Sequence, residues 1–310
     1  MSRYIIKRLL FIIPTLLLVA FIVLFIMDLT PSDPGTLILG DNAKAEDIEA
    51  LNEELGYNDP FIVRYVRFIW DAVRGDLGES WQTGRSVTST IAQRLPVTAT
   101  LALGSLVFGS IIGILLGILS AVKQYSILDF FSTTLAMALG AFPSFWIGMM
   151  LILIFSLGLG WLPSFGAGGI KNFILPWATA GCFMVSSLLR MTRTSMLEAI
   201  RMDYIRTARA KGQTERKIIT RHALRNALLP VVTVLGVSFG TMLAGTVTVE
   251  TVFSLPGVGL MIIEGIRMKD VPVVTGATVV LAAMFTVLML FVDILYAFID
   301  PRIKARYAKK

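Results

Sequence analysis

The chain has 310 residues, of which 55% are hydrophobic and only 16% are charged, and its formal net charge is +7. Ordinary soluble domains carry about 25% charged residues, so this composition excludes a soluble globular enzyme, a disordered chain and a disulfide scaffold. A polytopic membrane protein remains, and in such a protein an excess of basic residues reports orientation rather than nucleic-acid binding.

Six runs along the chain contain no charged side chain. They are residues 9–27, 97–122, 130–170, 172–189, 226–249 and 271–292. A membrane-spanning helix needs about 20 apolar residues, so five of these runs predict one helix each. The run 130–170 is longer and rich in turn-forming residues in its second half, so we expect one helix over about 130–156, followed by an ordered loop at the membrane surface. The expected fold is an all-α bundle of six transmembrane helices.

The distribution of charge predicts the orientation of this bundle. With six spans, both termini lie on the same side as the segments near residue 123 and over 190–225. That side carries 19 basic and 5 acidic residues, whereas the opposite side carries 9 basic and 14 acidic residues. Because basic loops stay in the cytoplasm, both termini are expected to be cytoplasmic. The first span is expected to be retained, since no small-x-small cleavage site follows it.

Three regions are expected: residues 1–94 with the first transmembrane helix and a partly helical outer segment, residues 95–300 with the other five helices, and residues 301–310 as a basic cytoplasmic tail. In the outer segment, Asp59 and Pro60 predict the start of an amphipathic helix. Its polar stripe consists of Arg64, Arg67, Asp71 and Arg74. Its apolar residues are Phe61, Ile62, Tyr65, Phe68, Ile69 and Ala72. Such a helix either lies on the bilayer or forms a docking platform for an external partner.

Several residues in the spans are candidates for lining a pathway. Pro143 is expected to kink the third span. Glu250, at the outer end of the fifth span, is placed to line an entrance or to brace the turn that follows it. The full set of pathway candidates is Phe142, Pro143, Phe145, Thr241, Gly245, Thr248 and Glu250.

Small residues recur at every fourth position in three spans. The stripes are Ser105, Gly109, Gly113 and Gly117; Ala136, Gly140, Ser144 and Gly148; and Gly236, Gly240 and Ala244. This spacing places each stripe on one helical face, where backbones can approach closely. The stripes are either static packing surfaces or surfaces that slide when the bundle changes shape, and the sequence leaves both interpretations open.

The cytoplasmic loop 191–227 contains the most specific pattern of the chain. Asp203 is expected to cap a short helix, Gly212 is placed to end it, and Thr214 is placed to cap the next helix. The result is a short helix held crosswise between two spans. Ala208 and Ala210 leave its surface shallow, and Arg206, Arg209 and Lys211 make it basic. Such an element can fit a groove on a partner and transmit its motion, whereas a plain membrane-proximal basic loop would explain only the charge.

The sequence Tyr204–Gly212, followed by Arg221–Pro230, closely resembles the cytoplasmic loop of ABC importer permeases of the peptide/nickel/opine class. Further resembling blocks occur in order along the chain, namely Gly-Asp-Leu-Gly at 75–78, Gly-Trp-Leu-Pro at 160–163, Glu-Thr-Val-Phe-Ser-Leu-Pro-Gly at 250–257, Asp-Ile-Leu-Tyr at 293–296 and Asp-Pro-Arg-Ile at 300–303. Arg206 stands where the wider superfamily has glutamate, and Arg225 where it has its first proline. The resemblance is therefore to the peptide-class variant.

The resemblance implies a type I ABC importer permease-like fold in the cytoplasmic membrane of a bacterium or archaeon. The chain would be one of two non-identical permease subunits, and two cytoplasmic ATPase subunits would bind ATP and Mg. An extracytoplasmic binding protein would deliver the substrate, most often a di- or oligopeptide, but in relatives nickel complexes, glutathione, opines or oligosaccharides. The residues implied to contact an ATPase are Asp203, Tyr204, Arg206, Thr207, Ala208, Arg209, Ala210, Lys211 and Gly212.

The chain itself carries no sequence for catalysis. It lacks the Gly-x4-Gly-Lys-Ser/Thr phosphate loop and any nucleophile–base constellation in an aqueous segment, so we expect neither a cofactor nor an enzymatic activity. A single Cys182 and a single His222 cannot build a disulfide or a His-rich metal site. One alternative is a proton-coupled carrier that uses Asp293, a charge well inside a span, or Glu250. Another is an intramembrane enzyme, which would need converging catalytic groups.

Overall fold

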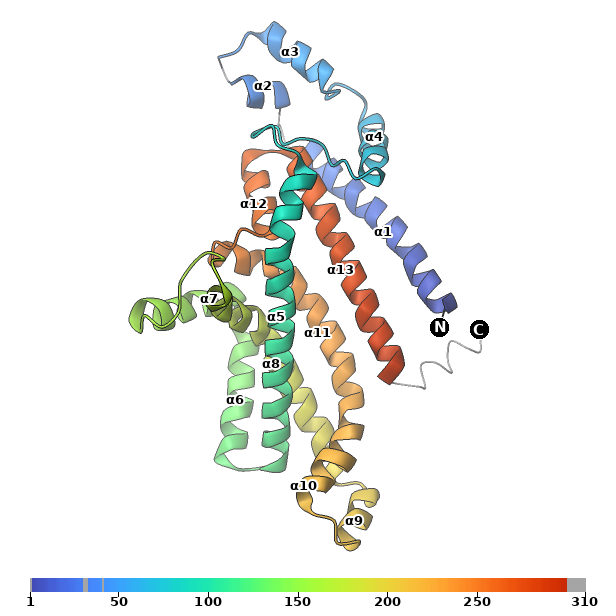
Figure 1. The fold of residues 1–310 in the computed structure, drawn as a ribbon, viewed down its shortest axis with the longest axis vertical. Helices are drawn as coiled ribbons and strands as arrows, with labels where there is room; N and C mark the ends of the chain where they lie inside the picture. The colour runs from blue at the N-terminus through green and yellow to red at the C-terminus, as the bar shows by residue number, and fades with distance from the viewer. Residues whose placement is uncertain (1, 30–32, 41, 300–310) are drawn as a thin grey trace. The chain divides into compact units, whose positions relative to one another are not determined.

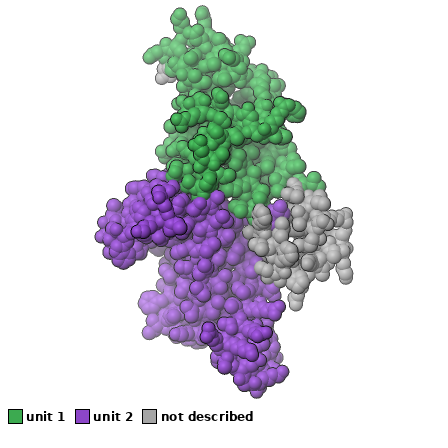
Figure 2. Space-filling model, viewed as in Figure 1, with its two compact units in different colours: residues 1–98, 256–288 green, residues 99–255, 289–310 purple. Residues whose placement is uncertain are grey.

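The computed structural model describes residues 2–29, 33–40 and 42–299, with side chains for residues 10–29, 33–40 and 42–290. The chain divides into two compact units (Figure 2). Unit 1 comprises residues 1–98 and 256–288, and unit 2 comprises residues 99–255 and 289–310. Within the described residues the secondary structure is helical, with one isolated antiparallel bridge between Glu79 and Ser86. The expected basic tail, 301–310, lies outside the described residues.

Unit 1 contains the first helix, the outer segment and two later helices (Figure 1). Its elements are α1 (Ser2–Asp28), α2 (Pro34–Leu39), α3 (Ala45–Glu54), α4 (Phe61–Val73), the start of α5 (Val87–Val122), α12 (Val258–Met268) and most of α13 (Val271–Ile299). The core of the unit consists of Leu77, Val87, Ile91, Val258, Met261, Val273 and Ala277. The partly helical outer segment expected after the first helix is confirmed.

Buried polar side chains hold the outer segment together. The Asn52 side chain accepts a hydrogen bond from the Gly35 amide (2.8 Å) and donates one to Asp33 Oδ1 (2.7 Å), which ties α2 to α3. The loop before α5 is fixed by Ser80, whose Oγ donates to Asp270 Oδ2 at 2.6 Å. Asp270 is 2% exposed, so this bond between residues distant in sequence is shielded from water.

Unit 2 is built around α8. Its elements are the rest of α5, α6 (Ile127–Ala141), α7 (Ser144–Leu151), the π-helix η1 (Ile152–Gly158), α8 (Ile170–Ile200), α9 (Asp203–Ala210), α10 (Glu215–Lys217), the π-helix η2 (Ile218–Ala223) and α11 (Leu224–Val252). Helix α8 contacts α6, α7 and α11. The short helices α9 and α10 lie between α8 and α11 along the chain and form the lower tip of the unit in Figure 1.

Five helices are long and apolar enough to cross a membrane, and a bent pair of helices makes a sixth if it counts as one span. The pair joins Ile127–Ala141 to Ser144–Gly158 at an angle of 113°. The prediction of one helix over 130–156 is wrong in this respect, because Pro143 ends α6 instead of only kinking it. A proline pushes the preceding residue into an extended conformation, and Phe142 has ψ 141°. The expected loop after this span is confirmed between η1 and α8.

Candidate functional site

Helix α9 begins without a side-chain cap. Met202 occupies the N-cap position in an extended conformation, with φ −71° and ψ 151°. Asp203 is the first helical residue, and its exposed carboxylate lies 3.7 Å from Arg206. The prediction that Asp203 caps α9 is therefore wrong, and its charge instead lies near the positive end of the helix dipole. Thr214 does occupy the N-cap position of α10, but its side chain makes no capping hydrogen bond.

The end of α9 is a Schellman motif built on Gly212. This glycine has φ +75°, in the left-handed region that suits a residue without a Cβ atom. Its amide donates to the Arg209 carbonyl at 2.9 Å, and the Gln213 amide donates to the Ala208 carbonyl at 3.3 Å. These two bonds satisfy carbonyls that the helix end leaves without partners. The prediction that Gly212 ends the helix is confirmed.

The inner face of α9 packs on its own unit. Ile205 is completely buried and Ala208 is 7% exposed. Both belong to an apolar cluster with Ala121, Met196, Ala199, Ile218, Ala223 and Ala227. The cluster joins α9 to the ends of α5 and α8 and to the start of the long helix that follows. Ala208 therefore does not form the shallow outward surface that the sequence predicts for it, because it is needed for close packing inside.

The outer face of α9 is exposed and basic. Of the nine residues expected to contact a partner, all except Ala208 are exposed, namely Asp203, Tyr204, Arg206, Thr207, Arg209, Ala210, Lys211 and Gly212. Ala210 keeps this face shallow as predicted. A helix with an apolar inner face and an exposed outer face is anchored to one body and available to another.

Two polar contacts stiffen the turn after α9. Arg209 and Glu215 form a bidentate ion pair, with Nε–Oε1 at 2.7 Å and Nη2–Oε2 at 3.2 Å. The hydrogen bonds that Arg209 donates to the Glu215 carboxylate raise the pKa of its guanidinium above the usual value. The His222 ring nitrogen Nε2 lies 2.7 Å from Gln213 Oε1. Helix α9 is thus linked to the following helix by side chains as well as by the buried cluster.

Deleting one methyl group should show how firmly α9 is docked. We expect Ile205→Val to weaken the packing of α9 by about 1 kcal/mol and to speed amide exchange over 203–212 about fivefold. Hydrogen exchange on the full-length protein measures this. The matched control is Thr207→Ser, which also removes one methyl but from the exposed face, and which keeps the hydroxyl that donates to the Asp203 carbonyl. Equal exchange rates in both variants would show that the buried cluster does not hold the helix.

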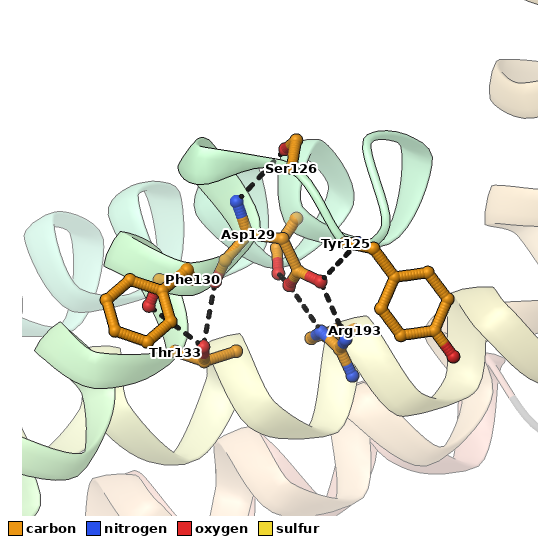
Figure 3. Close-up of polar contacts among 7 residues, drawn as sticks. Tyr125, Ser126, Asp129, Phe130, Thr133 and Arg193 are labelled. Carbon is orange, nitrogen blue, oxygen red and sulfur yellow. Dashed lines mark hydrogen bonds and ion pairs between the residues drawn. The ribbon is translucent and has the colours of Figure 1, made fainter.

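An ion pair between a buried aspartate and a half-buried arginine joins α6 to α8 in unit 2 (Figure 3). Arg193 of α8 binds Asp129 of α6 with Nε–Oδ1 at 2.7 Å and Nη2–Oδ2 at 2.8 Å. The Asp129 carboxylate also accepts hydrogen bonds from Ser120 Oγ and, at 3.0 Å, from the Tyr125 amide. Neither partner is among the residues that were predicted from the sequence. The available signal was the position of the two residues beside charge-free runs. Asp129 directly precedes the run 130–170, and Arg193 follows shortly after the run 172–189.

A cavity of about 240 Å³ lies among α6, α7, α8 and α11. It is lined by Leu139, Phe142, Ser144, Ile147, Thr179, Ala180, Cys182, Phe183, Thr241, Met242, Gly245 and Val249. Three of these, Phe142, Thr241 and Gly245, were predicted as pathway residues. None of the described residues that line the cavity is charged, and its polar groups are hydroxyls and a thiol. This composition suits a neutral passage rather than an ion-binding site.

The other pathway candidates lie elsewhere. Pro143 forms the break between α6 and α7. Phe145 and Thr248 are exposed, and neither lines the cavity. Glu250 is completely buried near the end of α11 and is not a lining residue. The side chain of Asp293 lies outside the described residues. Of the nine lining residues that were not predicted, four come from α8 and the others from α6, α7 and α11.

Comparison with known proteins identifies the family. The family described as "Binding-protein-dependent transport system inner membrane component" matches residues 113–305, and the corresponding N-terminal family matches residues 1–102. The glutathione transport system permease protein GsiC of Escherichia coli strain K12 is 40% identical over 304 residues, covering 98% of this chain and 99% of the relative. GsiC of Salmonella paratyphi A matches with the same identity and coverage.

Solved structures show the same fold at lower identity. The MetNI methionine ABC transporter, in an inward-facing conformation, matches with a TM-score of 0.56 and 19% identity over 68% of this chain and 96% of the other. An amino acid ABC transporter with histidines matches with a TM-score of 0.52 and 15% identity over 69% of this chain and 94% of the other. The apolar helices and both family matches agree with a multi-pass inner-membrane protein. This chain therefore belongs to the family of binding-protein-dependent transport system inner membrane components, the pore-forming permeases of ABC importers.

Proposed function

We propose that residues 203–212 transmit the movement of a cytoplasmic ATPase subunit to this permease. The observation that carries the proposal is the two-faced construction of α9, whose Ile205 and Ala208 are buried in the permease while the basic outer face is exposed. An exposed cationic helix is complementary to an acidic cleft, and its rigid attachment to α8 and α11 allows a push on α9 to move both helices. ATP and Mg then belong to the partner, and this chain is not catalytic.

The assembly that fits this role has further subunits. We infer a second, homologous permease, two ATPase subunits and an extracytoplasmic binding protein, with both termini of this chain in the cytoplasm. The excess of basic residues on the side that carries α9 supports the orientation. The proton-coupled alternative is not favoured, because the relatives of this chain are ABC transport permeases.

We propose that the substrate is a short peptide, with glutathione as the first compound to test. The support is the 40% identity over 98% of this chain to permeases named for glutathione transport. The cavity among α6, α7, α8 and α11 presents apolar and hydroxyl groups, which can pass a peptide without binding its charged ends tightly. Selection among peptides would then lie mainly with the external binding protein.

A bulky substitution on the outer face of α9 tests the proposal. We expect Ala210→Trp in the complete transporter, reconstituted in liposomes, to reduce uptake of labelled glutathione per ATP hydrolysed at least about tenfold, since a clash of about 1.4 kcal/mol already shifts an equilibrium by that factor. Its thermal melting should stay unchanged, because Ala210 is exposed.

The control is Glu54→Trp, which places the same bulky side chain at an exposed residue of the outer segment. It should leave the ratio of uptake to hydrolysis intact. Wild-type coupling in Ala210→Trp would refute the role of α9. Coupled uptake of other peptides but not of glutathione would leave that role standing and refute only the substrate.

A further inference from the structure

Helix α4 presents three different faces. The face toward the rest of unit 1 carries Phe61, Tyr65, Phe68 and Ala72. The polar stripe of arginines and Asp71 forms a second face. The third face is apolar and exposed, and it consists of Ile62 (59% exposed), Val63 (45%), Val66 (57%), Trp70 (60%) and Val73 (81%). Of these five residues only Ile62 was predicted to lie on the apolar side, so one apolar face was expected where the structure has two.

The contacts of α4 with α1 place it beside a membrane span. Phe61 stacks edge-on against Phe21 and Phe25, with ring centroids 5.3 and 5.8 Å apart. The Tyr65 hydroxyl donates to the Leu17 carbonyl at 3.1 Å. Leu17 is about 16 Å along the helix axis from Asp28, the last residue of α1, if each residue contributes the usual rise of about 1.5 Å. Since α1 is one of the helices that can cross the membrane, the first turn of α4 lies beside the outer half of this span.

The surface next to this third face is itself suited to lipid. Helix α1 exposes Leu18 (58%), Ile22 (45%), Phe25 (47%) and Ile26 (55%). A membrane span must present such a surface to lipid, and this surface meets α4 where Phe25 packs on Phe61, next to Ile62. Trp70 carries Arg74 over its ring at 4.4 Å from the centroid. An aromatic ring beside an arginine that can reach the headgroups is typical of a membrane–water interface.

We propose that Ile62, Val63, Val66, Trp70 and Val73 insert into the outer leaflet of the bilayer, with the arginines of the polar stripe at the level of the lipid headgroups. The ion pair between Arg64 and Asp28 fixes the start of α4 to the end of α1. In this arrangement α4 anchors the outer segment to the membrane. It also holds α1 against the rest of unit 1, and α2 and α3 are kept at a defined height above the lipid.

Spin labels test this placement in the complete transporter in liposomes. Val66→Cys, Val73→Cys, Ile22→Cys and Glu53→Cys are each labelled in a Cys182→Ser background, and collisions with oxygen and with a water-soluble nickel chelate are compared. We expect the ratio of oxygen to nickel accessibility at Val66 and Val73 to match that at Ile22 and to exceed that at Glu53 by about an order of magnitude. All four labelled side chains are exposed or partly exposed, so the fold is not disturbed.

Two results would overturn the proposal. A nickel accessibility at Val66 equal to that at Glu53 would place the face of α4 in water. Low accessibility to both reagents would show that a protein subunit, not lipid, covers it. Neither result bears on the role of α9, which the uptake measurements test separately.

Discussion

Replacing Asp129 by alanine is expected to lower the free energy of unfolding by up to about 3–5 kcal/mol, because it leaves the partly buried Arg193 guanidinium without its counter-charge. The Asp129 side chain is only 6% exposed, so water screens this carboxylate little, whereas the Arg193 side chain, at 24% exposed, keeps partial contact with water. Each oxygen of the carboxylate accepts two hydrogen bonds. One comes from Arg193, and the other comes from Ser120 Oγ or from the Tyr125 amide. Bidentate charge-assisted bonds of this kind are the strong ones.

Thermal and denaturant unfolding of the detergent-solubilised transporter measures the effect. The double variant Asp129→Ala/Arg193→Ala should be less destabilised than the sum of the single variants, since it removes both charges together. The matched control is Asp203→Ala, which removes an exposed carboxylate 3.7 Å from Arg206 and should change stability by less than about 1 kcal/mol. A single Asp129→Ala variant as stable as this control would contradict the interpretation.

The position of this ion pair links it to the proposed coupling. Arg193 is on the last turns of α8, which leads directly into α9. Asp129 is on the first turn of α6, and Ser120 is near the end of α5. The pair therefore fixes the end of α8, the helix that would receive the push in the proposed coupling, to two neighbouring helices. If it breaks, movement of α9 should no longer pass undiminished to α6.

Local signals explain what the sequence could predict. Gly212 ends α9 because the chain needs a residue in the left-handed backbone conformation just after the helix. This requirement can be predicted from the neighbouring residues alone. A break at Pro143 can likewise be predicted from the local sequence. The angle of 113° between the two helices cannot, because steric exclusion of the helical conformation at Phe142 does not set the direction in which the chain continues.

Contacts between distant residues explain what the sequence could not predict. Asp129 and Arg193 are 64 positions apart, and their pairing depends on how α6 packs on α8. The same packing decides which face of α8 lines the cavity, so Thr179, Cys182 and Phe183 were missed. Ala208 and Ala210 are alike in sequence, and only the docking of α9 makes one of them buried and the other exposed.

The second large effect concerns Gly117 of α5. A Cβ atom at this position would lie 2.6 Å from Thr192 Cβ and 2.8 Å from the Leu189 carbonyl oxygen. Both atoms belong to α8, and the second is backbone, so the helices must separate to admit it. We expect Gly117→Ala to destabilise the protein by about 1–3 kcal/mol through this overpacking.

Gly245 of α11 is the matched control, because a Cβ atom there meets nothing within 4 Å. In a helix interior, alanine is normally better than glycine by about 0.8–1.0 kcal/mol, so Gly245→Ala should be neutral or stabilising. The same substitution is thus expected to have opposite signs on two helices of one unit, which melting temperatures of the two variants measure. Stabilisation by Gly117→Ala would contradict the contact between α5 and α8.

This contact also distinguishes the two interpretations of the glycine stripes. Gly109, Gly113 and Gly117 each meet α8, at Met184, at Leu188 and at Thr192 respectively. These three close approaches follow one another along the two helices, and two of them also involve backbone atoms of α8. Helices in such close contact pack as one body, as the static interpretation of this stripe requires. A shape change that an ATPase drives through α9 would then move α5 together with α8. Gly117→Ala should accordingly lose stability without changing the number of substrate molecules taken up per ATP by the transporters that remain folded.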